Sequence, residues 1–216
     1  ASFMPWLGGV ALLHSLAVTE KRGVFKAWTI MLAIFTFALS LLGTFLVRSG
    51  VITSVHSFAA DPTRGLFILV ILGVVIGGGL AMFAWRGWRL TQESHYQLKS
   101  RETLLVINNI IILVATIVVV IGTLYPMLAD ALKLGQVSVG APYFNALFVP
   151  LTWLLLLFLA IGPVSRWKKD TRPLLGTGLA ILASCFVLAG VLSYFLVSSI
   201  NINIFMSAAL CLWVLV

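Results

Sequence analysis

LLVINNIIILVATIVVVIGTL, residues 104–124, is the stretch that decides the fold. Its 21 residues include no charged side chain. A helix of about 20 apolar residues is long enough to cross the ~30 Å hydrocarbon core of a bilayer. The run therefore predicts a membrane-spanning helix.

The rest of the chain repeats this pattern. With 61% apolar and 9% charged residues it has too few charges to cover a soluble surface, so lipid must be its solvent. Seven apolar runs occur, at 4–19, 27–47, 65–85, 104–124, 144–163, 174–198 and 200–216. We predict an all-α, polytopic transmembrane helical bundle of about seven segments, forming a single integral-membrane region over 1–216. The first and last runs are short and stop at the chain ends, so we expect an internal fragment of a larger protein.

The basic residues predict the orientation of this bundle. Eleven of the fourteen Lys and Arg residues lie in the alternate connections 20–26, 86–103 and 164–173. The positive-inside rule makes these connections cytoplasmic. The connection 48–64 and the N-terminus then face outward. The net charge of +8 reflects topology and attraction to anionic lipid rather than binding of nucleic acid.

His14 is an ionisable residue within the first apolar run, ~9 Å of helix rise from Glu20. Helical spacing places it on one face with Leu7, Val10, Ala11, Ala17 and Val18. An ionisable side chain at membrane depth suggests a function. Two interpretations stay open: a neutral histidine hydrogen-bonded to another helix, or an axial ligand of haem iron. A second histidine ligand would have to come from outside this chain, because no other apolar run contains one.

His56 lies in the outward loop 48–64. A short amphipathic helix is predicted there by an i, i+3, i+4, i+7 pattern: Ile52, Val55, His56 and Ala59. His56 would lie on its apolar face, either packed in the loop or available as a ligand. Asp61 before Pro62 predicts an N-cap and a first-turn proline, which begin the next membrane helix.

The remaining reactive side chains give no sign of catalysis. His95 lies in the charged cytoplasmic connection and is expected to be solvated, and Cys185 and Cys211 lie in apolar runs as small buried side chains. Five carboxylates fall at or beyond the predicted helix ends: Glu20, Asp61, Glu93, Glu102 and Asp130. This placement argues against a proton relay through the membrane.

Two strings, ASFMPWLGGVALLHSLAVTEKRG at 1–23 and LLGTFLVRSGVITSVHSFAADP at 41–62, closely resemble the CcmF family of cytochrome c maturation proteins. This family is the large membrane subunit of the bacterial system I cytochrome c haem lyase. The resemblance is specific over residues 1–65 and looser beyond them. In the family a tryptophan-rich outward segment, the WWD domain, lies directly upstream, and Ser2 to Trp6 correspond to its trailing edge.

The resemblance implies a role for two residues. His14 matches one of two transmembrane histidines that ligate a structural or redox haem b. His56 matches one of two periplasmic histidines that hold the haem being delivered. In both cases the second histidine lies outside this chain, and no catalytic residue is expected within it.

The resemblance also implies a mechanism at the periplasmic face of the bacterial inner membrane. Haem arrives on a haem chaperone, and the two thiols of an apocytochrome c add across its vinyl groups. Thiol-reducing maturation subunits and quinol would supply the reducing conditions, the latter through the membrane haem. The alternatives are a haem-free polytopic transporter, a scaffold subunit of a membrane complex, or a paralogue dedicated to one special cytochrome c.

Overall fold

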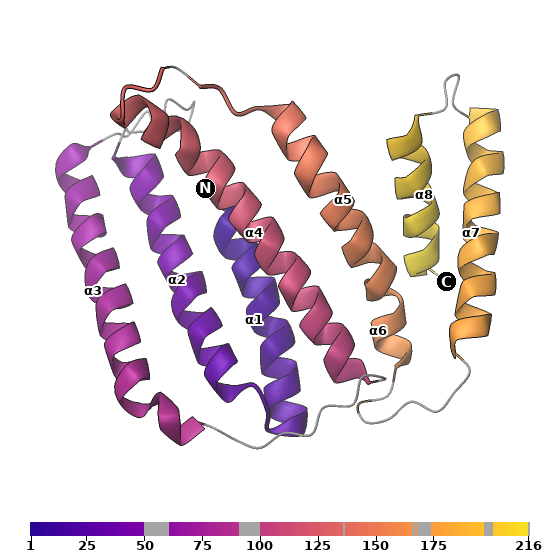
Figure 1. Cartoon of the computed structure of the whole chain (residues 1–216), viewed down its shortest axis with the longest axis horizontal. Helices are drawn as coiled ribbons and strands as arrows, with labels where there is room; N and C mark the ends of the chain where they lie inside the picture. Colours follow the sequence, from indigo (N-terminus) through magenta and orange to yellow (C-terminus); the bar gives the residue numbers. More distant parts are fainter. Residues whose placement is uncertain are drawn as a thin grey trace. The chain divides into compact units, whose positions relative to one another are not determined.

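The helices follow the apolar runs closely in the computed structural model (Figure 1). The structure describes residues 1–49, 61–90, 100–135, 137–165, 167, 174–196 and 201–215. Its helical elements, in chain order, are α1 (Phe3–Arg22), α2 (Lys26–Arg48), α3 (Pro62–Arg86), η2 (Gly87–Leu90), α4 (Arg101–Ala131), α5 (Ala141–Leu159), α6 (Ile161–Val164), α7 (Leu174–Leu196) and α8 (Ile202–Leu215).

Five spans are long and apolar enough to cross a membrane: those in α2, α3 with η2, α4, α5 and α7. The described residues contain no β-strand. The prediction of an all-α, polytopic membrane bundle is therefore confirmed. The predicted outer segments appear as α1, with 20 residues, and α8, with 14 residues.

The chain divides into two compact units. The first comprises Ala1–His95 and Ile112–Leu147, and the second comprises Tyr96–Ile111 and Phe148–Val216. Within the first unit α2 packs between α1 and α3 (Figure 1). Within the second unit α7 and α8 lie side by side (Figure 1).

A tight turn makes α1 and α2 an antiparallel pair. α1 ends at Gly23, which has a left-handed φ of 72° and whose N–H donates to the Thr19 carbonyl at 2.8 Å. Glycine adopts this conformation at little cost, which is why it is common at helix C-termini. Only two residues separate Gly23 from the first residue of α2, so the chain reverses its direction within a short connection.

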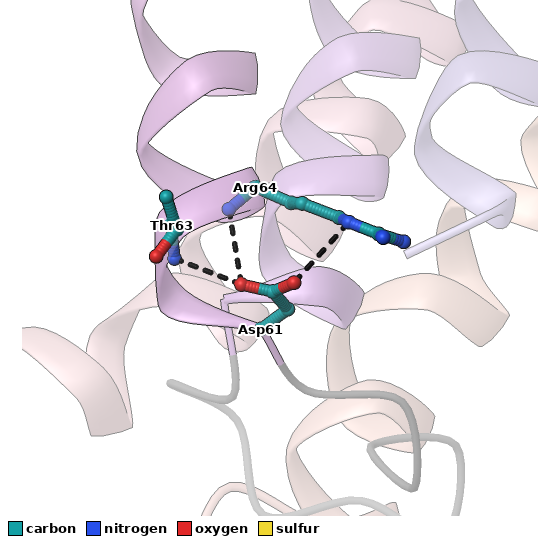
Figure 2. Close-up of polar contacts among 3 residues, drawn as sticks. All are labelled: Asp61, Thr63 and Arg64. Carbon is teal, nitrogen blue, oxygen red and sulfur yellow. Dashed lines mark hydrogen bonds and ion pairs between the residues drawn. The ribbon is translucent and has the colours of Figure 1, made fainter.

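Asp61 begins α3 as the sequence predicts (Figure 2). Its Oδ1 accepts hydrogen bonds from the backbone N–H groups of Thr63 at 3.1 Å and Arg64 at 3.2 Å. Pro62 occupies the first helical position, where no N–H is needed. The Arg64 Nε also lies 3.2 Å from Asp61 Oδ2. The predicted N-cap and first-turn proline are therefore confirmed.

Two helix ends differ from the edges of the apolar runs. α4 continues through Pro126 to Ala131, well past Leu124 where the run ends. The run 144–163 is divided, because α5 ends at Leu159 and α6 follows. Pro163, in α6, has no N–H to donate to the Leu159 carbonyl, so the α-helical hydrogen bonding is interrupted there.

The second unit has a small core on α7 and α8. It consists of Cys185, Leu210 and Trp213, packed against partly buried side chains of α5 and its neighbours. The prediction of a buried Cys185 is confirmed, whereas the same prediction for Cys211 is wrong, since Cys211 is exposed. Leu210 faces the core, and the next residue in a helix points about 100° away from it.

Candidate functional site

Three hydroxyl groups join α1 to α2 next to His14. Ser15 Oγ lies 2.7 Å from Thr29 Oγ1, and Thr19 Oγ1 lies 2.8 Å from the same Thr29 atom. Thr19 also donates to the Ser15 carbonyl at 2.9 Å. Ser15 is completely buried and Thr29 nearly so. Away from water these hydrogen bonds have no solvent substitute, so they hold the two helices in one register.

Two helical turns before Ser15, the backbones of α1 and α2 approach each other closely at Gly8. A Cβ atom placed on Gly8 would lie 2.9 Å from Thr36 Oγ1, which is closer than such atoms pack. The neighbouring Gly9 has no heavy atom within 4 Å of the same position. Gly8 therefore faces α2, whereas Gly9 does not.

His14 lies beside this packed face of α1. Its side chain is half-buried, and its Nδ1 atom is buried. Leu7, Ala11 and Val18, predicted to share its face, are all buried. Since the helix rises 1.5 Å per residue, His14 lies roughly 16 Å along α1 from Phe3. The structure therefore places an imidazole well inside the helical span.

The end of α2 and the start of α3 are held together. The Asp61 N–H donates to the Arg48 carbonyl at 2.8 Å. A Cβ atom on Gly65 would lie 2.9 Å from Ser49 Cα, so only glycine allows this approach. The C-terminal end of α2 and the N-terminal end of α3 are therefore adjacent.

The N-terminus of the chain lies near that end of α2. A Cβ atom on Gly43, one turn before Arg48, would lie 3.1 Å from the Ala1 carbonyl oxygen. Phe3 and Trp6 stack with their ring centroids 5.5 Å apart, and Trp6 is 61% exposed. An exposed aromatic pair thus lies on the first turns of α1, at the same end of the α1–α2 hairpin as the C-terminus of α2.

The structure describes one of the two predicted haem ligands. His14 lies on α1, whereas His56, His95 and the predicted amphipathic helix of the loop 48–64 fall outside the described residues. Within the described ranges no three His, Cys, Asp or Glu side chains come together as a metal-binding group. His14 can therefore supply one ligand but not a complete metal site.

Sequence reasoning missed the hydroxyl groups and Gly8. Gly8 and Ser15 are seven residues apart on α1, and Thr29 and Thr36 are seven apart on α2. Seven residues make two helical turns, so each pair shares a face. This spacing of small residues was the available signal, since small side chains mark close helix contacts in membranes.

Comparison with known proteins first gives the class. The family model for cytochrome C assembly protein matches residues 1–53, which include α1 and α2. Together with the membrane-spanning helices, this match makes the chain similar to polytopic membrane proteins of the cytochrome c assembly type.

Individual relatives match the chain over most of its length. Cytochrome c-type biogenesis protein CcmF of Pseudomonas aeruginosa is 57% identical over 190 residues, covering 88% of this chain and 29% of the relative. CcmF of Escherichia coli K12 is 48% identical over 221 residues, covering 100% of this chain and 34% of the relative. The solved structure of the cytochrome c haem lyase CcmF matches with a TM-score of 0.70 and 26% identity, covering 98% of this chain and 30% of that one. The chain is homologous to the CcmF proteins and spans about a third of the length of the curated relatives it matches.

Proposed function

We propose that this chain is part of a cytochrome c haem lyase, which holds haem for covalent attachment to apocytochrome c. The observation that carries the proposal is the similarity to CcmF, which extends over 88% to 100% of the chain in the two relatives and 98% in the solved structure. The match to the Escherichia coli relative covers the whole chain, so it includes the segments that contain His14 and His56. We do not expect this chain alone to be active, because each proposed haem takes a second ligand from elsewhere in the protein.

His14 is proposed as an axial ligand of a transmembrane haem b. A neutral imidazole is a good iron ligand, and His14 is half-buried within the apolar helix α1. The haem, once bound, would carry electrons within the membrane. The contribution of this chain is to present one imidazole at a fixed depth.

His56 is proposed as a ligand of the haem that is delivered, which is the substrate. The joined ends at Arg48 and Asp61 support this role, because the described residues on both sides of His56 meet at one end of the α1–α2 hairpin. The exposed Phe3–Trp6 pair at this end offers an aromatic surface for a flat, apolar ring. His56 would orient the iron and then give way to the histidine of the cytochrome.

The proposed setting is the inner membrane of a bacterium, with the N-terminus and residues 48–64 on the periplasmic side. The concentration of basic residues in the connections 20–26, 86–103 and 164–173 supports this orientation. The proposed partners are a haem chaperone, apocytochrome c, thiol-reducing maturation subunits and quinol. The surrounding lipid bilayer is the remaining partner.

The transporter alternative is not favoured. Glu20 lies in the last turn of α1, Asp61 caps α3, Glu102 lies in the first turn of α4 and Asp130 near its end. No carboxylate of the described residues thus lies in the middle of a span, where a proton or ion path would need one. The similarity to proteins named CcmF also favours general cytochrome c biogenesis over a paralogue with one special target.

Substitution of His56 in the full-length protein tests the proposal. His56→Ala should abolish holocytochrome c formation in a strain that lacks its own copy, while the membrane haem and the protein level stay unchanged. His95→Ala is the matched control and should leave the yield intact. An unchanged yield of holocytochrome c in His56→Ala would remove His56 from the site.

A further inference from the structure

The contacts between α1 and α2 form a regular seam. Three pairs make it up: Ala1 with Gly43, Gly8 with Thr36, and Ser15 with Thr29. Each step of seven residues forward along α1 is matched by seven residues back along α2. Two helical turns return to the same face, so the seam is a heptad repeat of small side chains between antiparallel helices.

The seam fixes the rotation of α1 about its own axis. At Gly8 there is no room for a Cβ atom, whereas the next position along the helix, Gly9, is open. At Ser15 a hydroxyl lies on Thr29, whereas the next residue, Leu16, is 45% exposed. Turning α1 by one residue would bring a bulky side chain against α2 and break a buried hydrogen bond. Both changes cost free energy in an apolar setting.

His14 directly precedes Ser15, so its side chain leaves α1 about 100° from the seam. We propose that the seam is a positioning device for His14, which sets the direction in which the imidazole meets the haem iron. The inference rests on the proposed function, because it takes His14 to be an iron ligand. Ligand groups must be held within about 0.5 Å and 10–20° of their working geometry, and a single helix without such a lock would not achieve this.

Gly8 offers the sharpest test because a matched control adjoins it. In Gly8→Ala the new methyl meets Thr36 Oγ1, so α1 must shift or turn. Gly9→Ala adds the same methyl where nothing lies within 4 Å. Thr36→Ala removes the obstructing oxygen, which is buried and makes no hydrogen bond within the described part of the chain. The double variant Gly8→Ala/Thr36→Ala should therefore restore the wild-type position of α1.

The experiment uses full-length protein purified from haem-replete cells. The readouts are the electron paramagnetic resonance spectrum of the ferric membrane haem and the haem content at limiting haem. The largest g value of a bis-histidine haem reports the angle between its two imidazole planes. Gly8→Ala should shift this value and lower haem content by about tenfold. Gly9→Ala and the double variant should match the wild type. A general loss of stability would lower the yield without moving the g value.

Thr29→Val and its control Thr44→Val test the same proposal at a second position of the seam. If Gly8→Ala does not accumulate, Thr29→Val removes the hydroxyl that holds Ser15 and Thr19, and it should shift the g value in the same way. Thr44→Val is its control, because among the described residues the Thr44 hydroxyl bonds to the Ser40 carbonyl of its own helix and to no residue of α1. A haem retained in His14→Ala would refute the proposed ligand. A haem lost in His14→Ala, together with wild-type spectra in Gly8→Ala or Thr29→Val, would refute the seam as a positioning device and leave the ligand standing.

Discussion

The backbone N–H of Asp61 lies 2.8 Å from the carbonyl oxygen of Arg48. This bond joins the first residue before α3 to the last residue of α2, although twelve residues separate them in sequence. The Asp61 side chain begins α3 at the same point. Asp61 therefore both bonds back to the end of α2 and starts α3.

Removing the Asp61 carboxylate should loosen the first turn of α3. Asp61→Ala loses the acceptor for the N–H groups of Thr63 and Arg64, at a cost of about 1 kcal/mol. Hydrogen exchange of these two amides should become about fivefold faster. Asp61→Asn is the control, since asparagine caps as well as aspartate and gives up only the exposed ion pair with Arg64, worth a few tenths of a kcal/mol. Equal exchange in both variants would show that the cap is unimportant.

A side chain at position 65 should force α2 and α3 apart. In Gly65→Ala the new Cβ meets the backbone of Ser49, which cannot rotate away, and overpacking of this kind costs about 1–3 kcal/mol. Unfolding of the full-length protein in a titration with sodium dodecyl sulfate should therefore begin at lower detergent. Gly73→Ala, on the same helix but with nothing within 4 Å, should increase stability or leave it unchanged. A Gly65→Ala protein as stable as Gly73→Ala would contradict the close approach.

In the second unit, Trp213 should stabilise the end of α5. Its Nε1 donates to the Leu157 carbonyl at 3.0 Å, and Leu157 lies among the last four residues of α5, whose carbonyls lack helical partners. Trp213→Phe keeps an aromatic ring but loses this donor, so it should cost about 1–3 kcal/mol in the same titration. Trp85→Phe, at a residue that is 77% exposed, is the control and should change nothing. Equal stability of the two variants would argue against the bond.

Local features of the fold could be predicted from the sequence, and contacts between helices could not. The spans follow from apolar length, and the Asp61 cap follows from a short pattern of residues. Cys211 was misjudged, since a helix that is apolar on all sides does not reveal which side packs.

In the candidate site, too, the local features were predictable from the sequence and the contacts between helices were not. The position of His14 among apolar residues followed from helical spacing, and the structure confirms that Leu7, Ala11 and Val18 beside it are buried. The bond between Ser15 and Thr29 depends instead on the register of two helices, which the turn at Gly23 and the close approach at Gly8 set together. No single helix contains that information.

The central claim is that this chain holds haem through histidine, and the visible spectrum of the full-length protein tests it most directly. Wild-type protein from haem-replete cells should show the Soret band of a bis-histidine haem. His14→Ala should lose that band, since the methyl group of alanine cannot ligate iron. A colourless wild-type protein, or an unchanged Soret band in His14→Ala, would contradict the claim.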